Sequence, residues 1–193
     1  MTRPRTTPRH LVAVPLLAAL LLTGLLAPPA QAALPSQSQW TTDVDHAMSG
    51  SRIYLRDRVG DSAVGKKLAV NLDIDNTSLA SHYDAGTPVP VVLRFARYAR
   101  SHGVLLLFNT GRRRGGGRLL AAERQLTAAG YRVTEVCGRA SGEALAAGKQ
   151  RCRRHFAAQG YTIVANVGNR ATDFTGGDYE RAFRLPDYDR QLA

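Results

Sequence analysis

The chain has 193 residues, with 26 Lys and Arg against 15 Asp and Glu, a formal charge of +11, and 44% of its residues are hydrophobic. This length and composition fit one globular domain and exclude a collagen-like or wholly disordered chain. Two cysteines are too few for a small scaffold held together by disulfides. Arginine carries most of the positive charge and suits bidentate binding of phosphate or carboxylate, so we expect anionic partners.

Residues 1–32 have the layout of a secretory signal peptide. Arginines without any acid come first, an apolar run covers 11–27, and Ala30-Gln31-Ala32 supplies the small residues of a cleavage site. We therefore predict export of a mature single domain over 33–193, with no membrane span after cleavage. The alternative is an uncleaved anchor, although the apolar run is shorter than the ~20 residues that a spanning helix needs.

Helical and strand patterns alternate along the mature part. A helix is predicted over about 41–59, where Thr42 and Asp43 can cap it, although Gly50 weakens the pattern. The core is expected over about 67–193. The predicted strands are 67–73, 104–108, 131–136 and 161–167, with a short fifth over 182–185. The predicted helices are 89–101, 119–129 and 141–159.

Strands that alternate with helices of this length indicate an α/β fold with a mainly parallel sheet. Ligands of such sheets bind at the carboxyl ends of the strands. The sequence places polar residues directly after three of the predicted strands, which makes those positions the candidates for chemistry.

The first of these segments is Asp73-Ile74-Asp75-Asn76-Thr77. If the strand conformation persists, the two carboxylates point to the same side. Like charges that close either repel or share a cation or a proton. One aspartate can then act as a nucleophile while the other handles protons, with a hard divalent cation neutralising both. The alternative is a polar turn with two solvated aspartates.

Further candidates follow in the later strands and in one helix. Asn109-Thr110-Gly111-Arg112 offers a hydroxyl, a glycine and a guanidinium that could hold a phosphoryl oxygen. Lys149, the one lysine after the first strand, is a compact point charge, unless it belongs to a solvated helix face. Asp173, in the segment Gly168-Asn169-Arg170-Ala171-Thr172-Asp173, adds a third carboxylate.

Together these segments resemble the haloacid dehalogenase (HAD) superfamily, in particular its exported acid-phosphatase-like branch, subfamily IIIB, over about 67–177. LAVNLDIDNT is similar to the first motif of that superfamily and LLLFNTGRR to the second. Lys149 is similar to the lysine of the third motif, and IVANVGNRATDF resembles the fourth. The resemblance implies a Rossmannoid three-layer sandwich with a minimal cap insertion.

The resemblance also implies phosphoryl transfer, with a role for each motif. Asp73 would attack phosphorus to give an aspartyl-phosphate, and Asp75 would protonate the leaving group and then activate water. Thr110, Gly111 and Lys149 would bind the phosphate. Mg²⁺ would bind the Asp73 carboxylate, the Asp75 main-chain carbonyl and Asp173.

One position departs from the family pattern. Asn169 stands where the fourth motif is usually acidic. Its amide can still offer an oxygen to Mg²⁺ but brings no charge. We therefore expect weaker or differently arranged metal binding rather than loss of activity.

The segment between the first two motifs, 78–87, is short, so a small cap would leave the site open and the specificity broad. The candidate substrate contacts are Asn76, Arg112, His82 and Tyr83, although an exposed loop is the alternative for the last two. The basic, glycine-rich segment 111–118 could cradle an anion or be a flexible loop.

The two cysteines, Cys137 and Cys152, form an even count in a chain predicted to be exported, which favours a disulfide. Two buried free thiols are the alternative, because the sequence does not show whether the Cβ atoms meet.

The favoured function is an exported, Mg²⁺-dependent phosphomonoesterase that acts on small phosphorylated substrates. The alternative is a catalytically weak HAD-fold protein that binds polyanions such as nucleic acid or an anionic cell-wall polymer. Residues 94–154 hold 14 Lys and Arg against three acids. This local surplus suits a phosphorylated substrate and does not require nucleic acid.

Overall fold

The computed structural model describes residues 33–61 and 65–192 and builds them around one parallel sheet. The five strands lie in the order β3-β2-β1-β4-β5, and every neighbouring pair is parallel. Their bounds are β1 Lys67–Leu72, β2 Leu105–Arg113, β3 Glu135–Arg139, β4 Tyr161–Gly168 and β5 Arg181–Arg184. The predicted α/β fold with a parallel sheet is confirmed.

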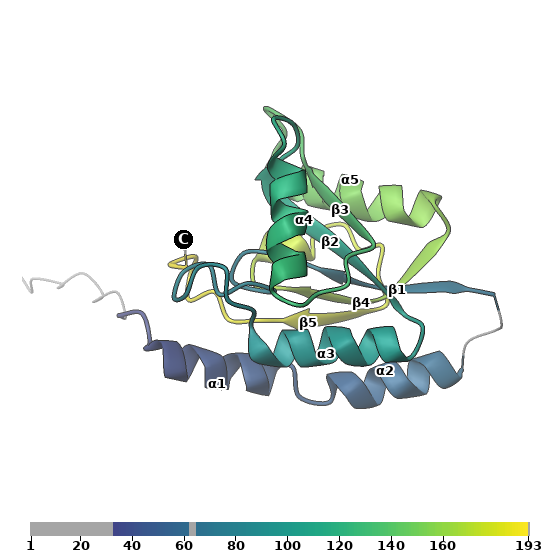
Figure 1. Cartoon of the computed structure of the whole chain (residues 1–193), viewed down its shortest axis with the longest axis horizontal. Coiled ribbons are helices and arrows are strands. Elements are labelled where there is room, and N and C mark those ends of the chain that lie inside the picture. The colour runs from purple at the N-terminus through teal and green to yellow at the C-terminus, as the bar shows by residue number, and fades with distance from the viewer. Residues whose placement is uncertain (1–32, 62–64, 193) are drawn as a thin grey trace, which may run out of the picture. The chain divides into compact units, whose positions relative to one another are not determined.

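Helices cover both faces of the sheet (Figure 1). Alternate strand residues divide between the faces: Val70 and Leu106 pack with the first four helices, whereas Ala69 and Leu107 pack with α5. The helices are α1 Gln37–Ala47, α2 Ser51–Gly60, α3 Pro90–Ser101, α4 Arg118–Ala128 and α5 Leu145–Ala158, and a 3₁₀ turn, η1, covers Ala171–Asp173. Of the described helices, α5 thus stands opposite the other four, which gives three layers.

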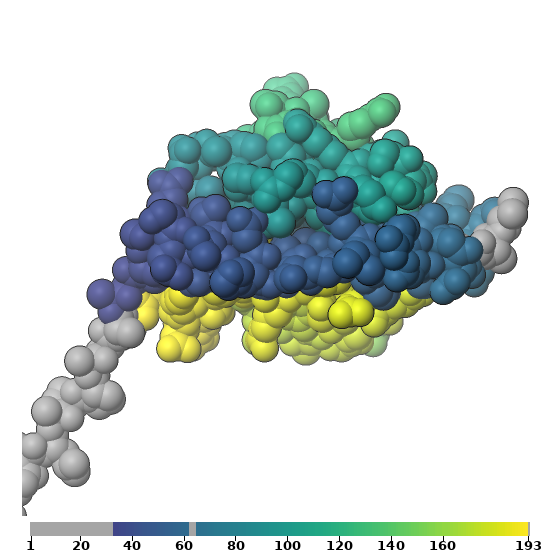
Figure 2. All heavy atoms as spheres, turned by 90° about the horizontal axis from the view of Figure 1, so that it is seen from below, coloured from purple at the N-terminus to yellow at the C-terminus, as the bar shows by residue number. Residues whose placement is uncertain are grey.

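The single helix predicted over 41–59 is wrong, because two helices, α1 and α2, occupy this segment. The break comes at Gly50, whose φ of 73° lies in the left-handed region that glycine adopts without a steric penalty. After the break, Tyr54 donates a hydrogen bond to the Val164 carbonyl of β4 at 2.8 Å. Figure 2 shows these two helices, purple to blue, running across one side of the molecule between α3 and the C-terminal segment.

Other boundaries differ from the predicted ones at strand ends. β2 runs on to Arg113 because it continues to pair with β3: Asn109 and Thr110 pair with Cys137 and Gly138, and Arg113 pairs with Arg139 after a register shift. β3 begins only at Glu135. Residues 131–134 precede it without belonging to the strand, and Tyr131 among them is buried. Polar residues that were expected just after β2 therefore belong to the strand itself.

A disulfide joins β3 at the edge of the sheet to α5. Cys137 and Cys152 are bridged across a Cα–Cα distance of 5.7 Å. Cys152 lies one turn after Lys149 on α5, so the bridge fixes the part of the helix that carries this lysine.

Replacing both cysteines by serine is expected to lower the free energy of unfolding by about 3 kcal/mol, because the bridge closes a loop of 15 residues in the unfolded chain. Urea unfolding of the oxidised protein and of the double variant measures the difference. Wild type treated with a reductant should unfold at the same urea concentration as the variant. Identical stability of oxidised and reduced wild type would contradict the prediction.

No helix within 33–61 or 65–192 is long and apolar enough to cross a membrane. Residues 1–32, for which the sequence predicts a signal peptide, lie outside the described residues. Export and the alternative of an uncleaved anchor both stay predictions.

Candidate active site

The end of β1 is held in place by main-chain and side-chain hydrogen bonds. The Asp73 amide donates to the Val167 carbonyl at 2.9 Å, and the Asp73 carbonyl accepts from the Ser78 hydroxyl at 2.6 Å. Asn76 adopts a φ of 55°, and its side-chain oxygen accepts from the His82 amide at 2.8 Å. This tight turn leaves the first carboxylate at the carboxyl end of the central strand.

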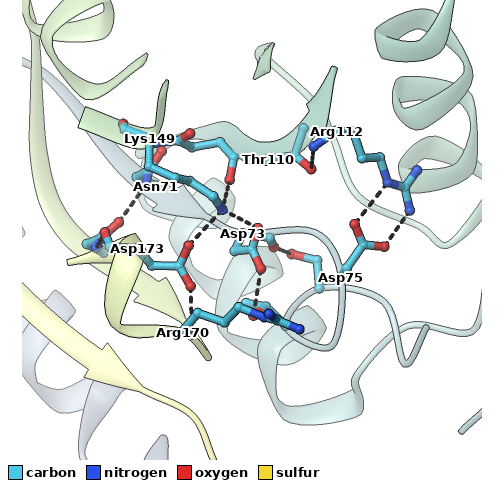
Figure 3. A network of polar contacts seen from close by, with 12 residues as sticks. Asn71, Asp73, Asp75, Thr110, Arg112, Lys149, Arg170 and Asp173 are labelled. Carbon is cyan, nitrogen blue, oxygen red and sulfur yellow. Dashed lines mark hydrogen bonds and ion pairs between the residues drawn. The ribbon is translucent and has the colours of Figure 1, made fainter. Parts of the chain in front are cut away.

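A buried lysine, Lys149, contacts polar groups from several segments of the site (Figure 3). Lys149 is 4% exposed and donates to three acceptors. They are the Asp73 carboxylate, the Asn109 carbonyl at 2.6 Å and the Asp173 carboxylate at 2.7 Å. Side chains predicted from three separate segments therefore meet at one point, at the carboxyl ends of β1, β2 and β4.

Two carboxylates face this one ammonium, so negative charge is in excess when both are ionised. Burial raises the pKa of Asp73 to about 7; Lys149 acts against this rise, and the Asp173 charge adds to it. For Lys149, burial alone would lower the pKa, but Asp73 and Asp173 outweigh burial and raise it. The lysine therefore stays protonated beside the two acids.

Asp75 forms a separate pair with Arg112. The guanidinium donates to the two carboxylate oxygens at 3.0 and 2.7 Å, and the Ser81 hydroxyl donates to one of them at 2.8 Å. Burial would raise the pKa of Asp75, but the hydrogen bonds and charge of Arg112 hold it below its ordinary value. Arg112, a predicted substrate contact, thus holds Asp75 ionised in the free protein.

Asp73 lines a cavity of about 320 Å³. Gly111 also lines it. A Cβ at that position would come within 2.8 Å of Leu145 Cδ1, so a larger residue would displace the Leu145 side chain, which lines the same cavity. Thr110 is buried, and its hydroxyl accepts from the Arg112 amide at 3.2 Å. The lining residues are Asp73, Asp75, Asn76, Gly111, Arg139, Leu145, Lys149, Arg170, Thr172 and Asp173.

His82 and Tyr83 are absent from the residues that line this cavity. The Tyr83 hydroxyl donates to the Pro35 carbonyl at 2.8 Å, and its ring stacks on Trp40 of α1 with centroids 5.1 Å apart. His82 lies against the same tyrosine. The short segment between β1 and α3 therefore packs against the N-terminal helix and adds no separate cap.

Several residues that support the site were not predicted from the sequence. Asn109 donates from its side chain to the Lys149 carbonyl at 2.7 Å, which anchors the lysine from both ends. Arg153, fully buried, donates to the main-chain oxygen of Asp173 at 2.7 Å. Asn166 of β4 donates to the same oxygen at 2.9 Å. For Asn166 the available signal in the sequence was a polar residue inside the apolar strand β4. Arg153 lies in a run of basic residues, so the sequence did not distinguish it from its neighbours.

The donors for a metal ion are oxygen atoms. Within the part of the chain that the structure describes, no three His, Cys, Asp or Glu side chains gather at a spacing that would hold a metal. The chain instead offers two aspartates and Asn169, whose buried amide oxygen and nitrogen have no hydrogen-bond partner among the described residues. The structure records Asn169 in the lining of a different pocket, with Asp43 and Asp187, and not in the lining of the Asp73 cavity. Carboxylate and amide oxygens are, in kind, the donors that suit a hard cation such as Mg²⁺.

A family model described as HAD superfamily, subfamily IIIB (Acid phosphatase), matches residues 83–191, more than half of the chain. The chain belongs to this family. Membership confirms the resemblance that the motifs indicated and makes the protein a phosphatase of the HAD superfamily. The matched range begins after Asp73 and Asp75, so the family match does not support the assignment of these two residues to the site, which depends on the geometry. No curated protein matches the sequence.

In this acid phosphatase family member, Gly168→Ala is expected to lower kcat for p-nitrophenyl phosphate at least ~10-fold. A Cβ at Gly168 would come within 2.6 Å of the Cβ and Cγ atoms of Asp173, so the carboxylate must move away from Lys149. Steady-state kinetics measures the loss. Gly60→Ala is the matched control, because a Cβ there meets no atom within 4 Å and Gly60, like Gly168, does not have a positive φ. Equal activity of both variants would contradict the prediction.

Proposed function

We propose that this phosphatase is an exported, Mg²⁺-dependent phosphomonoesterase that hydrolyses small substrates through an aspartyl-phosphate. The observation that carries the proposal is the contact of Lys149 with both Asp73 and Asp173, at the edge of a cavity of about 320 Å³. Asp75, two residues further on, lines the same cavity. A nucleophile, a proton carrier and a fixed positive charge are thus available to one bound phosphoryl group.

In the first step a carboxylate oxygen of Asp73 attacks phosphorus, and the bond between phosphorus and the ester oxygen breaks. Asp73 Oδ1 accepts a hydrogen bond from the Lys149 ammonium, whereas Oδ2 accepts only a weak one from the Thr77 hydroxyl at 3.4 Å. We assign the attack to Oδ2, because it has the lesser hydrogen bonding to give up. The product is an aspartyl-phosphate and the alcohol of the substrate.

Asp75 carries the proton in both steps. It gives a proton to the leaving oxygen, and it then takes one from the water that attacks phosphorus and releases inorganic phosphate from Asp73. Because Arg112 holds Asp75 ionised in the free protein, this pair must open before Asp75 can carry a proton. A substrate phosphoryl group is an anion that can compete for the same guanidinium.

Thr110, Gly111 and Lys149 are assigned to the phosphoryl oxygens. Lys149 is already charged and fixed by three acceptors, so its field needs no rearrangement when charge shifts during transfer. Thr110 directly follows Asn109, whose carbonyl accepts from Lys149 at 2.6 Å.

Mg²⁺ would be held by the carboxylates of Asp73 and Asp173, the main-chain carbonyl of Asp75 and the amide of Asn169. When bound, it neutralises charge on the phosphoryl oxygens. Asn169 adds a donor without a charge, which favours weak binding of the ion. The export of the protein is proposed from the layout of residues 1–32 and agrees with the disulfide, since such bridges persist in oxidising compartments.

The test is hydrolysis of p-nitrophenyl phosphate by purified protein, first with a chelator and then with Mg²⁺ in excess. We expect p-nitrophenol and inorganic phosphate in equal amounts, with activity that Mg²⁺ restores. Hydrolysis that Mg²⁺ does not stimulate would overturn the metal dependence. No hydrolysis, together with salt-sensitive binding of a polyanion, would support the binding-protein alternative instead.

A further inference from the structure

Arg139, the last residue of β3, lines the cavity that contains Asp73. Its buried Nε atom has no hydrogen-bond partner among the described residues. The hydrogen bond recorded for its guanidinium runs from Nη1 to the Glu143 carbonyl at 3.3 Å, which is long. A guanidinium offers five N–H donors, so most of the capacity of Arg139 is unused.

The surrounding chain makes room for this arginine. A Cβ at Gly148 of α5 would lie 3.0 Å from Oε2 of Glu143, and 3.2 and 3.3 Å from the Cγ and Cβ of Arg139. A glycine inside a helix costs about 1 kcal/mol relative to alanine, so this cost needs a local reason. The contact supplies one: α5 has no side chain at the point where the arginine stem lies against it.

The nearest acid does not neutralise Arg139. The Glu143 carboxylate accepts from Arg151 at 2.8 and 3.1 Å and from the Ala140 amide at 2.7 Å. These hydrogen bonds with Arg151 and Ala140 lower the pKa of Glu143 to about 2. The Glu143 carboxylate therefore forms its ion pair with Arg151. Within the described residues, no ion pair joins Arg139 to an acid.

The other positive groups near the cavity are mostly occupied. Lys149 uses its three donors on Asp73, Asn109 and Asp173, and Arg112 uses its donors on Asp75 and Gln125. Arg170, which also lines the cavity, gives one N–H to the Leu192 carbonyl at 2.6 Å. The free donor capacity that a ligand meets therefore belongs to Arg139 and Arg170, and of these two only Arg139 has a buried N–H without an acceptor among the described residues.

We propose that Arg139 binds a second anionic group on the substrate, so that the preferred phosphomonoesters carry a carboxylate or another phosphate. The inference rests on the proposed phosphomonoesterase function. The guanidinium would bind that group through two parallel N–H donors, with Arg170 adding positive charge, while the phosphoryl group to be transferred lies at Asp73. Substrates with a neutral group in that position would leave the Arg139 donors without an acceptor.

Two pairs of esters test the proposal, and each pair differs in one charged group. 3-Phosphoglycerate has a carboxylate where glycerol 3-phosphate has a hydroxymethyl group. Propane-1,3-diol bisphosphate has a second phosphate where 3-hydroxypropyl phosphate has a hydroxyl. We expect kcat/KM of the wild type to favour the doubly anionic ester of at least one pair by about 10-fold or more. The pair that shows the preference identifies the group that is bound.

The variant Arg139→Gln is expected to lose this preference. Arg139→Lys, which keeps the charge without the planar fork, should keep part of it. Arg124→Gln removes the same charge from an exposed position on α4 that does not line the cavity, and it should keep the full preference. A thermal unfolding curve for each variant separates a change in recognition from a failure to fold, and Arg139→Lys serves if Arg139→Gln does not fold.

Equal kcat/KM values within both pairs would overturn the proposal, as would an unchanged preference in Arg139→Gln. If no ester is hydrolysed, the proposed function fails, and calorimetric titration of the same four esters gives the preference as a ratio of dissociation constants. A ratio of about 10-fold that Arg139→Gln abolishes would still support anion binding at Arg139. A ratio near one would overturn it independently of catalysis.

Discussion

Replacing Asp73 by Asn is expected to lower kcat for p-nitrophenyl phosphate about 1,000-fold or more, because the amide cannot attack phosphorus as a carboxylate does. The shape of the side chain is nearly unchanged, so the cavity should keep its form. Steady-state kinetics with the phosphate ester measures the loss. Activity within about tenfold of the wild type would contradict the assignment of Asp73 as the nucleophile.

The stability of this variant provides its own control. Asp73 and Asp173 share one ammonium, so removing one negative charge leaves Lys149 with a full partner. We therefore expect Asp73→Asn to unfold at a temperature no lower than the wild type. Asp84→Asn, at an exposed position outside the cavity lining, should keep both activity and stability.

Replacing Lys149 by Met is expected to lower the free energy of unfolding by about 3–5 kcal/mol, because two buried carboxylates lose their positive partner. It should also abolish measurable phosphatase activity. Chemical denaturation measures the first effect, and p-nitrophenyl phosphate hydrolysis measures the second. Lys66→Met, at an exposed position before β1, changes the same residue type and should affect neither.

A double variant separates charge from packing. In Lys149→Met combined with Asp173→Asn, one of the two unpaired acids is neutral, so much of the lost stability should return. Activity should not return, because the fixed positive charge at the phosphoryl group is still missing. A double variant no more stable than Lys149→Met would show that the loss came from packing rather than from charge.

The fold followed from the sequence because apolar runs such as 104–108 mark buried strands and helical patterns separate them. The proximity of Asp73 and Asp173 followed as well, since parallel strand ends meet at one edge of the sheet. The break at Gly50 was harder to predict, because the apolar pattern continues across it and only the folded backbone shows the left-handed φ of 73° that separates α1 from α2. From the sequence, Gly50 indicated only a lower helix propensity and did not show that the helix ends there.

The remainder of the site depends on tertiary contacts that no local pattern encodes. Arg139 and Arg170 lie in a chain rich in arginine, so nothing in the sequence separates them from solvated arginines. Arg112 was placed near the phosphate by its position after Thr110, yet the structure pairs it with Asp75. Side-chain partners across long sequence separations decide such cases, and they appear only when the chain is folded.

The central position of β1 also sets when the site can form. β1 is hydrogen-bonded to β2 on one side and to β4 on the other, and the Asn71 and Asn166 side chains that meet across β1 and β4 are 95 positions apart. Contacts of such long sequence separation form slowly because a large loop must close first. A nascent chain that stops before β4 has Asp73 and β2 but lacks both β4 and Asp173. We therefore expect the candidate active site to form only once β4 and Asp173 are available, which requires nearly the whole sequence.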